Sequence, residues 1–304
     1  MDSSGEDIDI PRGRGLTMNE ESRWTRGLLI ILLPGILFIL LLFIYPFLYG
    51  LYLSLTDADG IFTLANYIKF FTDQWESRTV GITLSIAIPA TFLNVILAIP
   101  FAYHMRHGVR GEKLITFFLI VPITLGTVLI SEGMLSYMGP NGWLNQFLLA
   151  IHLIQKPIRF THNYLGVLIS LVIQGFPFAF LMLLGYISGI NPDLEKAAQM
   201  LGANKTQTFW KILFPLSVPG IAIAFCLNFV MAFSVFPSAV LLGEPSGPTR
   251  VISIAAYQWA FEKFDFNMGS AISLIMAVIE LFVISMVLLW RQRIYKGASI
   301  VGKG

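Results

Sequence analysis

The sequence predicts an all-α membrane protein that crosses a bilayer with six helices. Hydrophobic residues make up 56% of its 304 residues and charged residues only 12%, about half the charged share of an average soluble domain. The mean hydropathy of +0.73 agrees. Six apolar stretches are long enough to span a hydrocarbon core, which takes about 20 helical residues. The formal net charge of +2 is too small to indicate nucleic acid as a partner.

The six predicted spans share a length of more than about 20 residues and a near absence of charge. They are Gly27 to Leu55, Thr79 to Tyr103, Leu114 to Tyr137, Tyr164 to Ser188, Pro219 to Gly243 and Gly269 to Trp290. Several contain proline, which membrane helices tolerate because neighbouring helices and local adjustments re-satisfy the freed backbone groups. We therefore expect kinks.

The distribution of Lys and Arg predicts that both termini are cytoplasmic, because cytoplasmic loops carry the excess of these residues. Fourteen lie in the two tails and in loops 104–113 and 189–218, and six lie on the other side. The sequence thus divides into a cytoplasmic tail at 1–26, a transmembrane domain at 27–290 and a second cytoplasmic tail at 291–304. The composition of the first tail is typical of a disordered segment rather than a cleaved signal.

The loop at 189–218 is patterned as two short helices rather than as coil. Asn191 can cap the first helix and Pro192 suits its first position. Gly202 can end it, because glycine accepts the left-handed conformation of a C-cap. Apolar residues recur at helical spacing in each helix: Leu194, Ala197, Ala198 and Leu201 in the first, and Phe209, Ile212, Leu213 and Leu216 in the second. Pro215 and Pro219 are expected to end the second helix.

A small-residue face on a short cytoplasmic helix would let another protein approach its backbone closely. The same pattern is also typical of a helix that lies on the membrane surface or packs back on its own bundle. The pattern alone leaves these alternatives open.

The segment Leu194 to Gly220 resembles the EAA loop of the permease subunits of ABC importers. That pattern is Glu-Ala-Ala, three residues, Gly, nine residues, Ile, one residue, Leu-Pro. Its residues in register here are Ala197, Ala198, Gly202, Ile212 and Pro215. Lys196 stands where the pattern has Glu, and Phe214 where it has Leu. Glu195 could substitute for the missing Glu after a rotation of about 100°.

The resemblance implies a type I importer fold whose loop at 189–218 docks on an ATPase. The residues that would make this coupling contact are Glu195, Lys196, Ala197, Ala198, Gly202, Ile212 and Pro215. It also implies a second permease subunit, expected to form a heterodimer with this chain, and an extracytoplasmic solute-binding protein. The location implied is the bacterial inner membrane.

Three stretches resemble the spermidine/putrescine class of these permeases: the loop itself, the run from Phe236 to Gly243, and IYPFLYGLYLSLTD with FTLANYIKFF after it. The sugar class is the nearest alternative, but its loop usually has an acidic residue where this chain has Leu201. The resemblance favours a polyamine or a similar small polar solute.

The chain contains no G-x-x-x-x-G-K-[ST] phosphate loop, so we expect ATP and Mg²⁺ to be bound by a partner ATPase and no catalytic residue or cofactor here. The four histidines, His104, His107, His152 and His162, lack metal-ligand spacing to carboxylates, and no metal site is expected. Cys226 lies in an apolar run and is interpreted as a small buried hydrophobe.

Polar residues at membrane depth are the candidates for a translocation path, because a charge in hydrocarbon costs at least about 2.5 kcal/mol. They are Glu132, Gln174, Asn228, Ser234 and Glu280. For a cationic solute the two carboxylates would supply negative potential. Alternatively, Gln174 and Asn228 are interhelical hydrogen-bonding groups and Glu280 faces a polar partner on a neighbouring helix.

The outward loop from Glu244 to Met268 is rich in aromatic residues. They are typical of a membrane-interface belt, but the loop could also dock the binding protein, with Arg250, Glu262 and Asp265 as rim charges. A secondary transporter driven by an ion gradient is the rival from another class. One deep carboxylate and no visible inverted repeat make it the weaker interpretation.

Overall fold

The computed structural model describes residues 32–295, which are helical throughout except for connecting loops and one isolated bridge between Thr56 and Phe62. Six helical stretches in this part of the chain are long and apolar enough to cross a membrane. The predicted fold class is therefore confirmed. The predicted tail at 1–26 and residues 296–304 of the second predicted tail lie outside the described residues.

The six candidate spans follow the predicted order but differ in their limits: Leu32–Ser54, Gln74–Met105, Glu112–Ala150, Tyr164–Ser188, Lys205–Phe233 and Phe266–Arg293. The elements are η1 (Leu40–Ile44), α2 (Tyr45–Ser54), α3 (Ala65–Thr72), α4 (Gln74–Met105), α5 (Glu112–Met138), α6 (Trp143–Ala150), α7 (Tyr164–Ser188), α8 (Asp193–Met200), α9 (Lys205–Thr208), η2 (Phe209–Leu213), α10 (Phe214–Phe233), α11 (Pro237–Leu241), α12 (Ile252–Tyr257), η3 (Gln258–Glu262) and α13 (Phe266–Tyr295).

The chain divides into two compact units, the first ending at Tyr52 and the second beginning at Leu53. The first unit holds nearly all of the first span, whose most apolar stretch has no buried residue. A helix that is apolar on every side suits surroundings of lipid or of another chain.

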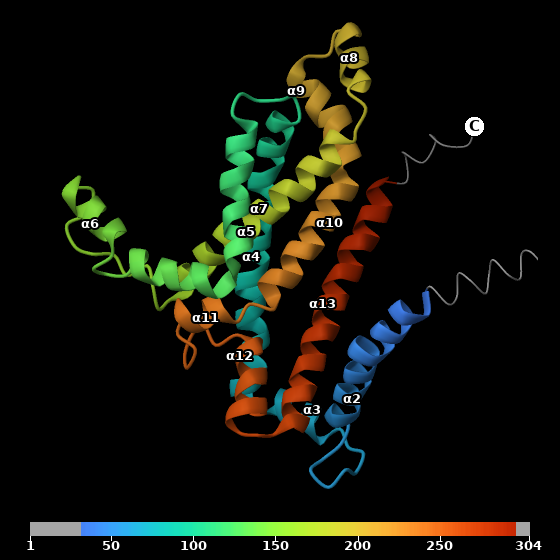
Figure 1. Ribbon diagram of the computed structural model, residues 1–304, viewed down its shortest axis with the longest axis vertical. Coiled ribbons are helices and arrows are strands. Elements are labelled where there is room, and N and C mark those ends of the chain that lie inside the picture. Colours follow the sequence, from blue (N-terminus) through green and yellow to red (C-terminus); the bar gives the residue numbers. More distant parts are fainter. Residues whose placement is uncertain (1–31, 296–304) are drawn as a thin grey trace, which may run out of the picture. The chain divides into compact units, whose positions relative to one another are not determined.

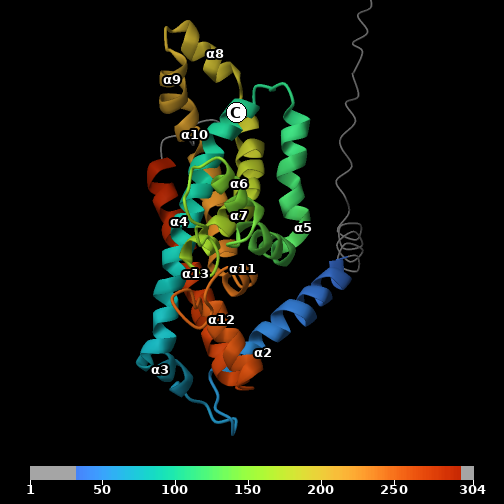
Figure 2. The same ribbon diagram turned by 90° about the vertical axis from the view of Figure 1, so that its left-hand side faces the viewer.

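Helices α4, α7 and α10 form the centre of the second unit, with α5 packed on α7 and α13 on α10. Helices α8 and α9 lie at one end of this bundle, and α3 and α12 lie at the other (Figures 1 and 2). Small residues let the central backbones approach closely. On α4, for example, Ala87, Ala90, Ala98 and Ala102 are all fully buried.

Side-chain caps fix where two of the three central helices, α4 and α7, begin. Asp73 Oδ1 accepts a hydrogen bond from the Trp75 amide at 2.8 Å at the start of α4, and Asn163 Oδ1 accepts one from the Gly166 amide at 2.9 Å at the start of α7. Each cap satisfies one of the amides that a helix N-terminus leaves without an intrahelical partner.

The prediction that Pro215 and Pro219 end a separate second helix is wrong. Helices α9, η2 and α10 form one continuous span from Lys205 to Phe233. Pro215 is the second residue of α10 and comes two residues after the wider helical turn of η2, where the usual pairing of residue i with i−4 is already interrupted. The span also ends before the predicted Gly243, because the chain leaves the helix after Phe233 and Pro237 starts α11.

Two further features distinguish the bundle. Gly126 breaks α5 with a φ of 75°, four residues after Pro122, a left-handed conformation that glycine adopts readily. Cys226, the chain's one cysteine, is buried in α10.

Candidate functional site

A polar cavity of about 120 Å³ lies among the central helices of the second unit. Its walls come from α4, α5, α7, α10 and the segment that leads into α11. The lining residues are Asn94, Thr127, Leu171, Gln174, Gly175, Asn228, Met231, Ala232, Ser234, Val235, Phe236, Pro237 and Ser238. None of them is a Lys, Arg, Asp or Glu.

Two buried asparagines form one wall of the cavity. Asn94 Nδ2 donates to Asn228 Oδ1 at 2.9 Å and to the Leu171 carbonyl at 3.2 Å, and Asn228 Nδ2 donates to the Gly175 carbonyl at 3.3 Å. Because both neighbours of the Asn94 amide are acceptors, its NH₂ group must face them. Its buried Oδ1 is left without a hydrogen-bond partner in the described chain.

A chain of side-chain hydrogen bonds forms the second wall. Ser238 Oγ lies 2.9 Å from Ser131 Oγ and 2.8 Å from Ser170 Oγ. Gln174 Nε2 donates to Ser170 Oγ at 2.6 Å and to Ser238 Oγ at 3.0 Å. Helices α5, α7 and α11 are thereby joined by polar contacts that satisfy one another, as polar groups in a membrane protein must be.

One carboxylate reaches the rim of the cavity. Ser234, an exposed lining residue just after α10, donates through Oγ to Glu280 Oε1 of α13 at 2.6 Å. The structure thus brings together four of the predicted path residues, which are Gln174, Asn228, Ser234 and Glu280. The fifth, Glu132, is exposed on α5 and does not line the cavity.

Sequence reasoning missed Asn94 and Ser238. Asn94 is the one side-chain amide in the predicted span from Thr79 to Tyr103, and this isolated polar residue was a usable signal. Ser238 gave none, because serine is common in membrane helices as a self-satisfied residue.

The loop after α7 has the predicted first helix. Asn191 Oδ1 accepts from the Asp193 amide at 2.9 Å, and Gly202 has a φ of +89° at the C-terminal end of α8. Of the apolar residues at helical spacing, Ala198 is buried together with Glu195, whereas Leu194 is 44% and Leu201 89% exposed.

The other residues named for coupling have varied surroundings. Lys196 pairs with Asp193 at 3.0 Å on the exposed surface, and Ala197 is exposed. Ile212 is half-buried and Pro215 is exposed at the start of α10. Glu195 is not available as a substitute for the missing motif Glu, because it pairs with Arg106 at 2.6 Å inside the chain.

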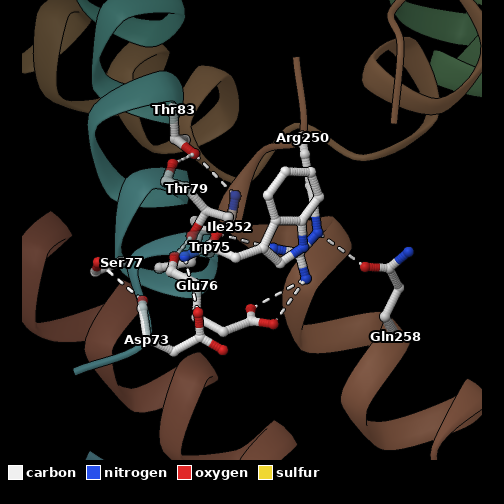
Figure 3. A network of polar contacts seen from close by, with 9 residues as sticks. All are labelled: Asp73, Trp75, Glu76, Ser77, Thr79, Thr83, Arg250, Ile252 and Gln258. Carbon is white, nitrogen blue, oxygen red and sulfur yellow. Dashed lines mark hydrogen bonds and ion pairs between the residues drawn. The ribbon is translucent and has the colours of Figure 1, made fainter. Parts of the chain in front are cut away.

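The interpretation of Arg250 as an exposed rim charge is wrong, since only 3% of it is accessible. Figure 3 shows its guanidinium between α4 and the outer loop. It donates to Glu76 Oε2 at 3.0 Å, to Gln258 Oε1 at 2.9 Å and to the Trp75 carbonyl at 3.3 Å. The paired carboxylate of Glu76 offsets the free-energy cost of removing the Arg250 charge from water.

The other two residues of the proposed docking set differ from Arg250. Glu262 is exposed. Asp265 Oδ1 accepts from the Met268 amide at 2.9 Å, so this carboxylate caps the start of α13. Within residues 32–295 no group of three or more His, Cys, Asp or Glu side chains is arranged to hold a metal ion.

Comparisons with known proteins cover most of the chain. A family model described as "Binding-protein-dependent transport system inner membrane component" matches residues 65–297. The spermidine/putrescine transport system permease protein PotB of Escherichia coli (strain K12) is 33% identical over 198 residues, which cover 63% of this chain and 71% of PotB. A probable sulfate transport system permease protein, cysT of Prototheca wickerhamii, is 28% identical over 209 residues, covering 68% of this chain and 80% of cysT.

A solved structure has the same fold. It is the crystal structure of a bacterial ABC transporter involved in the import of the acidic polysaccharide alginate, with a TM-score of 0.74 at 21% identity. The match covers 92% of this chain and 99% of that one. A second structure, with alginate pentasaccharide-bound periplasmic protein, gives a TM-score of 0.76 at 22% identity.

Proposed function

The chain belongs to the family of binding-protein-dependent transport system inner membrane components, the permeases of ABC importers, and on this premise we propose that its polar cavity passes a small cationic solute of the polyamine class. Family membership removes the rival interpretation of a secondary transporter. The solute would be delivered by an extracytoplasmic binding protein and driven through the path by ATP hydrolysis on a partner subunit.

The charge at the cavity carries the proposal. Its lining offers amide and hydroxyl groups, and the lining residue Ser234 holds the Glu280 carboxylate. An ammonium group is a donor only, and a carboxylate accepts. An oxyanion would meet repulsion from Glu280 and no compensating Lys or Arg in the lining. The similarity to PotB supports the same class.

The proposed orientation, membrane and partners of the chain rest on its sequence. Both termini and the loop at 189–218 face the cytoplasm of a bacterial inner membrane, the loop docks on an ATPase that binds ATP and Mg²⁺, and a second, different permease completes the path. The exposed apolar side of α8, with Leu194 and Leu201, supports the docking assignment, because an apolar helix face without a partner marks an interaction site.

Transport in this proposal is a shift between inward-facing and outward-facing states. ATP and the loaded binding protein must prefer the same state, because a ligand moves such an equilibrium only by its difference in affinity for the two states. In this proposal the solute occupies the cavity transiently while the protein changes from one state to the other.

The test uses proteoliposomes that contain the complete complex and its binding protein. We expect spermidine to be taken up and to stimulate ATP hydrolysis. Glu280→Gln should lower spermidine uptake about tenfold, because a hydrogen bond to a charged group contributes about 1.5 kcal/mol. Glu112→Gln, which removes an exposed carboxylate at the start of α5, is the matched control and should leave uptake unchanged.

The same preparation can overturn the solute class. Stimulation by sulfate or by a sugar, with none by spermidine, would reject the polyamine class. Equal uptake by Glu280→Gln and the wild type would reject the role of the rim carboxylate.

A further inference from the structure

The end of α4 holds the loop that follows α7 at three separate places. Arg106, the residue after α4, lies with Nη1 2.6 Å from Glu195 Oε1 of α8. Its Nη2 donates to the Ile190 carbonyl, before α8, at 2.8 Å. One turn back, the Tyr103 ring lies 4.9 Å from the Phe209 ring of η2. The residue before α8, α8 itself and η2 thus all contact the end of α4.

The contact between Arg106 and Glu195 is the buried one. The two side chains are 4% and 8% exposed, and the ring of His107, with Nε2 3.6 Å from the other Glu195 oxygen, is 53% exposed. Arg106 Nη1 and Glu195 Oε1 are not aligned for a hydrogen bond with each other, so they interact as a close pair of opposite charges. If either partner is removed, the other is left as a buried, uncompensated charge.

The rest of α8 has little else to fix it to the bundle. Glu195 and Ala198 are its buried residues, and its outer side, with Met200 at 82% exposure, faces away. Gly202, in the left-handed conformation, follows it. A displacement of α8 would therefore reach the span of α10 through the contacts of α8 with α9 and η2, and the end of α4 through this ion pair.

Helix α4 leads from the ion pair to the cavity. Asn94 lies twelve residues before Arg106, about 18 Å along the helix axis at 1.5 Å per residue, and its amide bonds both α7 and α10. Helix α4 is packed along α7 over most of this length. A shift of the α4 end would thus be carried to the cavity wall by a packed helix.

We propose that the Arg106–Glu195 ion pair is a positioning link that transmits the movement of α8 to α4, and so couples ATP hydrolysis to the opening of the cavity. This inference rests on the proposed docking of the loop on an ATPase. It assigns Glu195 an internal role in place of the contact with the ATPase that the motif resemblance suggested.

The test measures solute transported per ATP hydrolysed in proteoliposomes of the complete complex, for Arg106→Gln, Glu195→Gln and the double variant. Each single variant should retain the ATPase subunit and hydrolyse ATP but lose at least about tenfold in transport per ATP. The double variant should lose no more than either single one, because interacting residues are non-additive. Arg106→Lys, which keeps the charge, should recover part of the loss.

Arg110→Gln is the matched control, since it removes the same charge from an exposed position four residues on and should retain the wild-type ratio. Copurification of the ATPase and the thermal unfolding midpoint separate coupling from assembly and folding. A wild-type ratio in Arg106→Gln, or loss of the ATPase subunit from it, would overturn the link.

Spermidine is the solute in these measurements, and sulfate replaces it if the wild type transports sulfate instead. An error in the solute class therefore appears as a lack of spermidine uptake by the wild type. An error in the role of the ion pair appears as an unchanged transport per ATP in the variants.

Discussion

At the scale of single residues, Gly175 is the point where three helices meet. A Cβ atom there would lie 2.1 Å from Asn94 Nδ2 and 2.5 Å from Asn228 Oδ1. No real Cβ contact is so short, so both amides would have to leave their hydrogen bonds. Glycine is thus required by the close approach of α4 and α10 to α7.

Replacing Gly175 by alanine should destabilise the chain by about 1–3 kcal/mol, the usual cost of overpacking a well-packed interior. Unfolding of the purified chain in mixed detergent micelles measures this free energy. Gly185→Ala on the same helix is the control, because nothing lies within 4 Å of its added Cβ. Equal stability of the two variants would contradict the prediction.

The polar cavity shows how far single residues can be predicted. Gln174, Asn228, Ser234 and Glu280 are identifiable as candidates because a polar side chain is conspicuous in an apolar span. Their pairing was not predictable, because it depends on which helices face one another. The same limit hid Gly175, one of 26 glycines in the sequence.

At the scale of elements, the existence and approximate limits of α8 are predictable from its own segment, but which of its sides is buried is not. Asn191 and Gly202 act through the backbone of their own segment, so local rules sufficed. The buried side is decided by Arg106, a residue from another helix. Of the apolar residues at helical spacing, Ala198 lies on the buried side, whereas Leu194 and Leu201 are exposed.

Gly202→Val should separate ATP hydrolysis from uptake. A β-branched residue at a φ of +89° costs about 1–3 kcal/mol, which would shift the end of α8. We expect solute transported per ATP to fall severalfold in proteoliposomes while the protein still inserts. Gly189→Ala, at an ordinary φ of −75°, is the control and should couple normally. Normal coupling in Gly202→Val would rule out a role of this turn in coupling ATP hydrolysis to uptake.

At the scale of the whole molecule, the sequence predicts the number and order of the spans, because hydropathy is a property of each segment by itself. It does not predict contacts between distant segments. Arg250 and Glu76 are 174 residues apart in the sequence. Judged from its own segment, a charged residue in an aromatic loop is expected to be exposed at the rim of an interface. Only the packing shows that it is buried.

Glu76→Gln should lower the free energy of unfolding by about 3–5 kcal/mol, because it leaves the Arg250 charge buried without its carboxylate. Replacing both residues together, Glu76→Leu with Arg250→Met, should recover most of this loss. Unfolding in mixed micelles measures both variants. The control, Arg78→Gln, changes an exposed charge two residues away and should have little effect; a single variant as stable as this control would show that the pair contributes nothing.

The burial of Cys226 has a practical consequence for spectroscopy on this transporter. The chain has one cysteine, a buried residue of α10. A cysteine introduced at Gln199, which is exposed and lies away from the apolar side with Leu194 and Leu201, would therefore be the accessible thiol of this subunit. Fluorophores or spin labels attached there could report the motion of α8 during turnover without first removing the native thiol.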